Sequence, residues 1–272
     1  MTLKQCLSLA FTELTLARIP SAQLDIELIA SHVLQKERTW LITHDGYILS
    51  ETELEKINSM VAKRAKRVPL AYLTGHKEFY GREFIVTPDV LTPRPETEDL
   101  IEIIKQIKPK RLLDAGSGSG CIGLTSKLEL PDTCVTLSDI DELALEIAKQ
   151  NGESLSVGGI NYVESDLLEH WLHQDSLELY DLIVSNLPYV DRDWETSPEL
   201  DYEPETALYA ADNGLELIKK LIDQASQALT GSGYLLLEAD PRQHDRITRY
   251  SNQFTEVRRH NFALLLQLNT SF

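Results

Sequence analysis

The chain has 272 residues, of which 42% are apolar, and this is enough for one large domain and one smaller domain with a packed core. Lys and Arg total 26 against 43 Asp and Glu, so the formal net charge is −17. A field of that sign repels phosphate backbones and counts against an extended nucleic-acid-binding surface.

The first 67 residues predict helices only. The first helix carries apolar residues at the helical period: Leu3, Leu7, Ala10, Phe11 and Leu14. A second helix begins after Pro20 and has its own apolar positions: Leu24, Leu28, Ile29 and Val33. Ser50 to Glu53 is a capping box that begins a third helix. We interpret the basic run from Lys63 to Arg67 as the solvated end of that helix, because cations complement the helix dipole there.

A connector from Pro69 to Pro95 follows the helices. Residues 78–80 and 83–86 are rich in β-favouring side chains and flank Gly81-Arg82, which predicts a short hairpin. Two prolines then enclose Arg94 in the segment Leu91-Thr92-Pro93-Arg94-Pro95-Glu96-Thr97-Glu98. This segment predicts a stiff linker that leads into a helix through Ile107.

From Lys110 onward, strands alternate with helices. Predicted strands cover residues 111–114, 133–137, 160–163, 181–185 and 234–238. Predicted helices cover residues 121–130, 141–151, 215–229 and 241–250, and two strands at 254–259 and 262–268 close the chain. The alternation predicts a doubly wound parallel α/β sheet that ends in an antiparallel hairpin.

The segment from Tyr180 to Tyr189 has the most informative pattern in the chain. It predicts a buried strand that runs into Asn186, Leu187, Pro188 and Tyr189, at the sheet edge where such folds bind ligands. Asn is both donor and acceptor, and Pro holds the neighbouring carbonyl groups outward, which suits an NH2 group held by acceptors. An ordinary turn after a strand explains the same residues.

The loop from Asp114 to Gly120 lies between the first strand and its helix. Its glycines let a ligand approach the backbone at the helix N-terminus. A dinucleotide fingerprint fits as Gly118, Gly120 and Gly123 with Asp139 as the ribose acid, but it leaves three residues between strand and first glycine. The register Asp-x-Gly-x-Gly-x-Gly instead resembles the S-adenosylmethionine loop of methyltransferases, and acidic surroundings would suit the positive sulfonium of that cofactor. Asp166, after the third strand, lies where an adenine ring would bind or caps a helix.

Three segments together resemble one family: Leu91 to Glu98, Asp114 to Gly120, and Val184 to Tyr189. They are similar to the release-factor glutamine methyltransferases, the PrmC/HemK family, over nearly the whole chain. The resemblance implies a Rossmann-like class I methyltransferase sheet with a terminal antiparallel hairpin, plus a small all-helical N-terminal domain. The implied domains are residues 1–72 for substrate recognition, 73–95 as linker with β-hairpin, and 96–272 for methyl transfer.

The resemblance also implies roles for individual residues. Cofactor-binding residues would be Gly116, Ser117, Gly118, Ser119, Gly120, Asp139, Asp166, Leu167 and Asn186. Substrate-binding residues would be Asn186, Leu187, Pro188 and Tyr189, with Asn186 and Tyr189 catalytic. The family pattern has Pro where this chain has Leu187, which still supplies a carbonyl acceptor but less backbone stiffness.

The implied reaction transfers a methyl group from S-adenosyl-L-methionine to the amide nitrogen of the Gln in the Gly-Gly-Gln loop of peptide-chain release factors. S-adenosyl-L-homocysteine is the second product, and no metal or dedicated general base is expected. The alternatives are an adenine-N6 nucleic-acid methyltransferase, a ribosomal-protein glutamine methyltransferase, and a non-catalytic cofactor-binding module.

The remaining composition predicts where the protein works. The three cysteines form no CxxC pair, which favours a reducing compartment and no structural zinc. No charged-then-apolar signal opens the chain, and no apolar run is long enough to span a bilayer. We therefore expect a cytoplasmic monomer that meets release factors but neither membranes nor nucleic acid directly.

Overall fold

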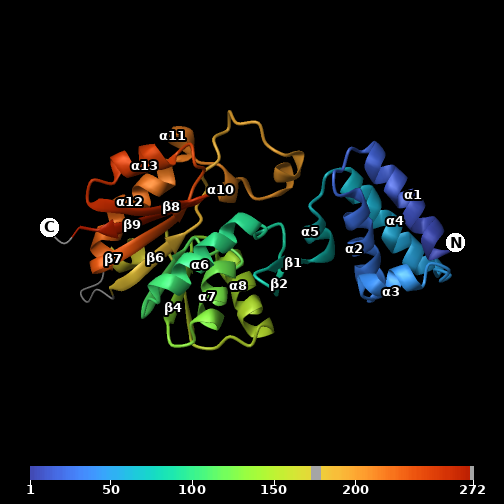
Figure 1. Cartoon of the computed structure of the whole chain (residues 1–272), viewed down its shortest axis with the longest axis horizontal. Coiled ribbons are helices and arrows are strands. Elements are labelled where there is room, and N and C mark those ends of the chain that lie inside the picture. The colour runs from blue at the N-terminus through green and yellow to red at the C-terminus, as the bar shows by residue number, and fades with distance from the viewer. Residues whose placement is uncertain (173–178, 270–272) are drawn as a thin grey trace. The chain divides into compact units, whose positions relative to one another are not determined.

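The computed structural model describes residues 1–172 and 179–269. These residues form two compact units. The first comprises Met1–His76 together with Ser197–Tyr202, and the second comprises Lys77–Thr196 and Glu203–Phe272. Residues 197–202 therefore belong to the first unit, although the residues on both sides of them along the chain, which Figure 1 colours by number, belong to the second.

The first unit is a helical bundle. Its helices are α1 (Leu3–Leu16), α2 (Ala22–Leu34), α3 (Arg38–Thr43), α4 (Glu51–Ala65) and α5 (Leu70–Thr74), and the 3-10 turn η2 (Pro198–Tyr202) joins them. The predicted capping box at Ser50 is confirmed, because its side chain accepts from the Glu53 N–H and the Glu53 carboxylate accepts from the Ser50 N–H. Helices α3 and α5 were not predicted from the sequence.

Two side chains that were assigned to apolar helix faces point outward instead. Phe11 and Leu24 are 41% and 42% exposed, whereas Leu14 and Ile29 are fully buried. The buried stripe of α1 consists of Leu3, Cys6, Ala10 and Leu14, a narrower face than the full set of apolar residues. Phe11 follows Ala10 by one position and so lies beyond the edge of that stripe.

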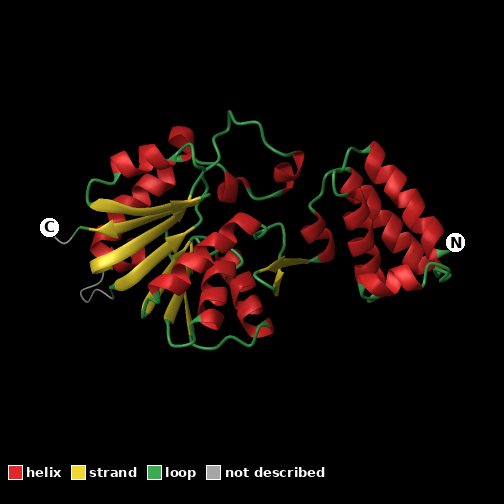
Figure 2. Cartoon of the chain, viewed as in Figure 1, coloured by secondary structure: helices red, strands yellow, loops and turns green. Residues whose placement is uncertain are grey.

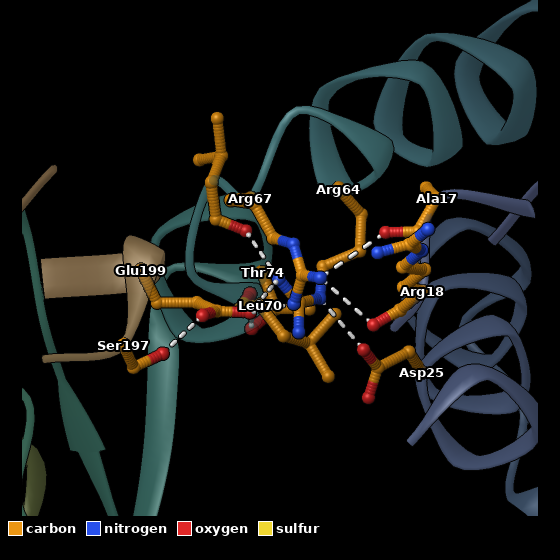
Figure 3. Close-up of polar contacts among 10 residues, drawn as sticks. Ala17, Arg18, Asp25, Arg64, Arg67, Leu70, Thr74, Ser197 and Glu199 are labelled. Atoms are coloured by element: carbon orange, nitrogen blue, oxygen red, sulfur yellow. Dashed lines mark hydrogen bonds and ion pairs between the residues drawn. The ribbon is translucent and has the colours of Figure 1, made fainter. Parts of the chain in front are cut away.

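The basic end of α4 is solvated only in part, which corrects the sequence-based interpretation: Lys63 and Lys66 are exposed, but the two arginines are held by other residues. Arg64 is only 6% exposed, and its Nε donates to Asp25 Oδ2 at 2.6 Å (Figure 3). Its Nη1 and that of Arg67 each donate to Glu199 Oε1 at 3.1 Å. Arg67 also donates to the carbonyl oxygens of Ala17 and Arg18. The two arginines thus hold η2 within the first unit.

The predicted hairpin is present, with its turn shifted by one residue. Strands β1 (His76–Phe79) and β2 (Arg82–Ile85) form a two-stranded sheet. The turn residues are Tyr80 and Gly81, with φ of 52° and 71°, rather than Gly81 and Arg82. Positive φ at both central positions gives the backbone twist that a two-residue hairpin turn requires.

The second unit is a seven-stranded sheet in the order β5-β4-β3-β6-β7-β9-β8 (Figure 2). Its strands are β3 (Arg111–Ala115), β4 (Cys134–Asp139), β5 (Ile160–Glu164), β6 (Tyr180–Ser185), β7 (Leu229–Glu238), β8 (Phe254–His260) and β9 (Ala263–Leu268). The first five are parallel, whereas β9 is antiparallel to both β7 and β8. The predicted parallel sheet with a terminal hairpin is confirmed.

Helices pack on the sheet, and short helices also occur within the long loop after β6. The larger ones are α6 (Glu98–Ile107), α7 (Cys121–Glu129), α8 (Glu142–Ser154), α12 (Glu216–Ala228) and α13 (His244–Tyr250). The short ones are η1 (Pro95–Thr97), α9 (Glu169–Leu172), α10 (Glu205–Leu208) and α11 (Ala211–Gly214). No helix in the described part of the chain has the length and apolar composition to cross a lipid bilayer.

Both faces of the sheet are buried. Successive strand residues alternate between two hydrophobic clusters: Leu113, Ile183, Leu235 and Leu264 pack with α12, whereas Leu112, Leu182, Leu236 and Leu265 pack with α6 and α7. Alternate side chains point to opposite faces, so a strand that is covered on both sides needs an unbroken apolar run. The carboxyl ends of these runs are where polar residues begin.

Candidate functional site

The site lies at the carboxyl ends of the central strands. The chain builds β3, β4 and β5 outward in one direction and then returns to place β6 on the other side of β3. The crevice between β3 and β6 is thus the topological switch point, where open α/β sheets bind ligands. The Ser185 hydroxyl donates to the Ala115 carbonyl across this pair and joins the ends of the two strands.

The glycine loop follows β3 and is folded by backbone contacts. The N–H groups of Gly116 and Ser117 donate to the Ser138 carbonyl at 2.8 and 2.9 Å, which draws the loop against the end of β4. Gly116, Gly118 and Gly120 all have positive φ, and a Cβ on Gly118 would meet nothing within 4 Å. Open space beside a backbone of this kind is what a bound ligand needs.

Two acidic side chains surround the loop. Asp139, which ends β4, accepts from the Gly118 N–H at 2.8 Å, and Asp114 in β3 accepts from the Gly123 N–H at 2.9 Å. Burial raises the pKa of both carboxyls, to about 7 for Asp114, where the neighbouring Asp139 charge adds to the effect. Asp114 Oδ1 is buried and has no hydrogen-bond partner among the described residues.

Asn186 follows β6 directly and makes contact with the linker segment. Its Nδ2 donates to the Thr97 hydroxyl at 3.4 Å, across 89 residues of sequence. The next side chain, Leu187, is 6% exposed and packs in the core beside Gly116, where an added Cβ would come within 2.9 Å of Leu187 Cδ2. The side chain that replaces the family Pro is therefore held by packing, as is the buried Pro188.

Tyr189 is held at both its side chain and its backbone. Its hydroxyl donates to Glu238 Oε1 at 3.3 Å, and its carbonyl accepts from Gln243 Nε2 at 2.8 Å. Any side chain at Gly214 would collide with that carbonyl oxygen, so the packing there admits only glycine. Burial, followed by the charge of Glu238, raises the pKa of the Tyr189 hydroxyl and keeps it protonated.

Glu238 is the most unusual group of the site. It ends β7 and is 2% exposed, and burial raises its pKa to about 7 although Thr97, Tyr189 and Asn186 donate toward it. Its Oε2 has no partner at hydrogen-bond distance among the described residues. From the sequence, Glu238 was predicted only as the last residue of a strand. The sequence does contain a signal for this residue. Glu238 is a carboxylate at the end of an otherwise apolar predicted strand, as Asn186 is a polar residue directly after one.

Arg94 of the linker segment also makes a defined contact. Its Nη2 donates to Glu203 Oε1 at 2.6 Å, and Glu203 further accepts from the Thr92 hydroxyl at 3.2 Å. The Glu203 side chain is 1% exposed, so the loop after Asn186 is anchored to the linker by a buried carboxylate. Arg94 could be identified from the sequence, whereas its partner Glu203, 109 residues away, could not.

Asp166 and Leu167 lie after β5 and stand apart from these contacts. The Asp166 carboxylate forms an ion pair with Lys220 at 2.6 Å, and both side chains are 38% exposed. Leu167 is 7% exposed and has φ of 51°, a left-handed conformation in a buried residue. Among the described residues, no three His, Cys, Asp or Glu side chains come together in a group that could hold a metal ion.

Comparison with known proteins identifies the family. A model described as "PrmC N-terminal domain" matches residues 5–75, and one described as "Methyltransferase small domain" matches residues 95–200. The chain is 38% identical to the release factor glutamine methyltransferase of Koribacter versatilis over 253 residues, 89% of each chain. It is 36% identical to that of Deinococcus radiodurans over 248 residues, 89% of this chain and 87% of the relative. The chain belongs to the release factor glutamine methyltransferase family.

Solved structures support the fold of this family member. A Pyrococcus furiosus methyltransferase aligns with a TM-score of 0.53 and 17% identity, covering 71% of this chain and 92% of its own. The Thermus thermophilus 16S rRNA N2 G1207 methyltransferase, solved with AdoMet and guanosine, aligns with a TM-score of 0.52 and 16% identity. The alignment covers 71% of this chain and 49% of that chain. The predicted family, the enzyme class and the class I methyltransferase fold are thus confirmed.

Proposed function

We propose that this enzyme methylates the side-chain amide nitrogen of the Gln in the Gly-Gly-Gln loop of peptide-chain release factors. The observation that carries the proposal is the position of Asn186, at the end of β6 and beside the glycine loop that follows β3. An amide acceptor at this point suits an NH2 substrate, and the relatives named above act on release factors.

The residues around the glycine loop fit S-adenosylmethionine. Gly116 to Gly120 would follow its methionine part, and Asp139 and Leu167 would lie beside its nucleoside. The buried, unpartnered Oδ1 atom of Asp114 suits a positively charged ligand, because this carboxylate lacks a cation among the described residues. When bound, this cofactor supplies an electrophilic methyl group.

The residues from Asn186 to Tyr189 would hold the glutamine. An amide nitrogen is a weak nucleophile because its lone pair is delocalised into the carbonyl group. Acceptance of its two N–H bonds by Asn186 Oδ1 and the Leu187 carbonyl would orient the nitrogen and favour a pyramidal, partly positive geometry. The ring of Tyr189, fixed at the hydroxyl and the carbonyl, would pack against the amide plane.

We extend the proposal to the rest of the molecule. The helical residues 1–72 would recognise the release factor, and residues 96–272 would perform the transfer, in a cytoplasmic monomer that needs no metal. The net charge of −17 favours a protein substrate over nucleic acid. Light scattering after size-exclusion chromatography tests the monomer, and a dimer would contradict it.

The direct test is transfer of labelled methyl from S-adenosylmethionine to a purified release factor. We expect label on the natural protein and none when its Gly-Gly-Gln glutamine is replaced by Ala. Label on both would place the methyl group elsewhere. Transfer only to adenine-containing nucleic acid or to ribosomal protein would favour those alternatives, and cofactor binding without any transfer would favour the non-catalytic module.

The role of Asn186 is tested separately with Asn186→Ala. We expect turnover to fall by about 100-fold or more, because an oriented acceptor is lost at the reacting group. Cofactor affinity, measured by calorimetry, should change far less. An equal loss of turnover and cofactor affinity would contradict the proposed substrate-holding role.

A further inference from the structure

A buried carboxylate faces the amide of Asn186 from the neighbouring strand. Strands β6 and β7 are parallel with Ser185 opposite Leu237, so the next residues along, Asn186 and Glu238, also lie side by side. Thr97 reaches the same point from the start of α6 and is 1% exposed. Three polar side chains from distant parts of the chain are thus enclosed at the end of the sheet.

When Glu238 is ionised, the chemistry of these groups favours one arrangement of the Asn186 amide. An ionised carboxylate accepts hydrogen bonds and cannot donate them, so the Thr97 hydroxyl and the Asn186 amide both donate toward Glu238. With its single hydrogen directed to the carboxylate, the Thr97 hydroxyl leaves its oxygen to accept from Asn186 Nδ2, which lies 3.4 Å away. Both contacts require the NH2 group of Asn186 on the inner side, since an amide oxygen there would face two acceptors.

We propose that Glu238 and Thr97 are positioning residues that fix the orientation of the Asn186 amide, with Oδ1 directed outward as the acceptor for the substrate NH2. This inference rests on the proposed function and adds to it the groups that determine which atom of Asn186 meets the glutamine. In the opposite orientation, Asn186 would present an NH2 group to another NH2 group, and neither could accept.

The same carboxylate also orients Tyr189. The Tyr189 hydroxyl donates to Glu238 Oε1 at 3.3 Å, so one buried group contacts both ends of the segment from Asn186 to Tyr189. Apart from Leu187 and Pro188, which are held by packing, the substrate-holding segment therefore depends on Glu238 for its side-chain directions. A buried charge at this point gives a rigid arrangement before the substrate arrives.

The kinetic test uses isosteric changes. Glu238→Gln introduces an NH2 donor, which lets Thr97 donate to Asn186 instead and removes the preference for one amide orientation. We expect kcat to fall by about tenfold to 100-fold, as for misplaced catalytic groups, with cofactor Kd unchanged. Thr97→Val should lower kcat by about tenfold, whereas Thr97→Ser keeps the hydroxyl and should retain kcat within about threefold.

Thr125 offers a matched control. It is fully buried in α7, and its hydroxyl has no hydrogen-bond partner among the described residues. Thr125→Val removes a buried hydroxyl as Thr97→Val does, and we expect it to leave kcat unchanged. If Thr97→Val and Glu238→Gln also leave kcat unchanged, the proposal is wrong. If Glu238→Gln lowers kcat but Thr97→Val does not, Glu238 acts by another route, such as proton acceptance, and the positioning role is again wrong.

A structural measurement on the substrate-free protein separates this inference from the proposed function. In the native chain, the side-chain NH2 hydrogens of Asn186 should show a nuclear Overhauser effect to the Thr97 methyl group, and this effect should weaken in Glu238→Gln. Its absence from the folded native chain would overturn the inference even if release factor is methylated. If release factor is not methylated but the effect is present, the proposed function fails while the orientation stands.

Discussion

The helical first unit and the candidate functional site treat carboxylates in opposite ways. In the first unit, Asp25 and Glu199 lie against the guanidinium of Arg64, which is itself only 6% exposed. In the second unit, Asp114 and Glu238 are buried without a cation, and the pKa of each rises to about 7. A carboxylate that is paired with a cation holds the packed segments together. A buried carboxylate without a cation carries a desolvation cost, which a bound cation or a proton can relieve.

Removal of the cation should have the largest effect. Arg64→Met keeps the length of the side chain but leaves Asp25 and Glu199 without their buried partner, so we expect the free energy of unfolding to fall by about 3–5 kcal/mol. Urea unfolding followed by circular dichroism measures the change. The control is Arg38→Met, since Arg38 is paired with Glu27 but half exposed and should cost under about 1 kcal/mol. Equal losses of unfolding free energy in the two variants would show that the buried ion pairs of Arg64 matter no more than an exposed one.

The unpaired Asp114 should show the reverse behaviour. Its folded pKa of about 7 lies above the ordinary value of 3.8, so its contribution to stability is complete at low pH and is lost as pH rises toward 7. Asp114→Asn should therefore raise the free energy of unfolding near neutral pH, by at most about 4 kcal/mol, and have little effect near pH 4. Urea unfolding of the cofactor-free protein across this range checks the sign, with the exposed Asp132→Asn as control. A loss of stability at neutral pH would contradict the comparison.

Glu238 should leave a signature in the pH dependence of turnover. Its carboxylate form orients Asn186, so kcat should increase by about tenfold between pH 6 and pH 8 as a group with a pKa of about 7 ionises. The groups that act on this carboxyl are Thr97, Tyr189 and Asn186 as donors and Glu96 as a like charge. The rise should be absent in Glu238→Gln. A rise of the same size in that variant would assign it to another group.

The smallest effect is expected at Glu199. Burial would raise its pKa, but hydrogen bonds from Ser197, Arg67 and Arg64 outweigh burial and lower it to about 2. A lowered folded pKa contributes stability above about pH 4.5 that is lost as pH falls toward 2. Glu199→Gln should reduce the free energy of unfolding at pH 7 by about 1 kcal/mol and by less in acid, as acid titrations would measure. If the stability difference between Glu199→Gln and the native chain were as large in acid as at pH 7, the ion pairs of Glu199 would not be its cause.

Local patterns were sufficient for most of the elements. The capping box at Ser50, the strand ending at Ser185 and the glycine loop after β3 each depend on residues within one turn or one strand of each other. Local patterns were less reliable for deciding which apolar side chains are buried and which residues occupy a turn. Phe11 and Leu24 had the right composition for a core but fell outside the buried stripe, and the hairpin turn was displaced because Tyr80 accepts a positive φ.

The sequence by itself determined the order of strands and helices, and it placed the glycine loop and Asn186 each at the end of a strand. Only the tertiary structure decided which partner each charged or polar group received. Arg64 meets Glu199 across 135 residues, Arg94 meets Glu203 across 109, and Asn186 meets Thr97 across 89. Periodicity and turn chemistry act over a few residues, whereas these contacts depend on how strands and helices pack, so no local pattern could name them.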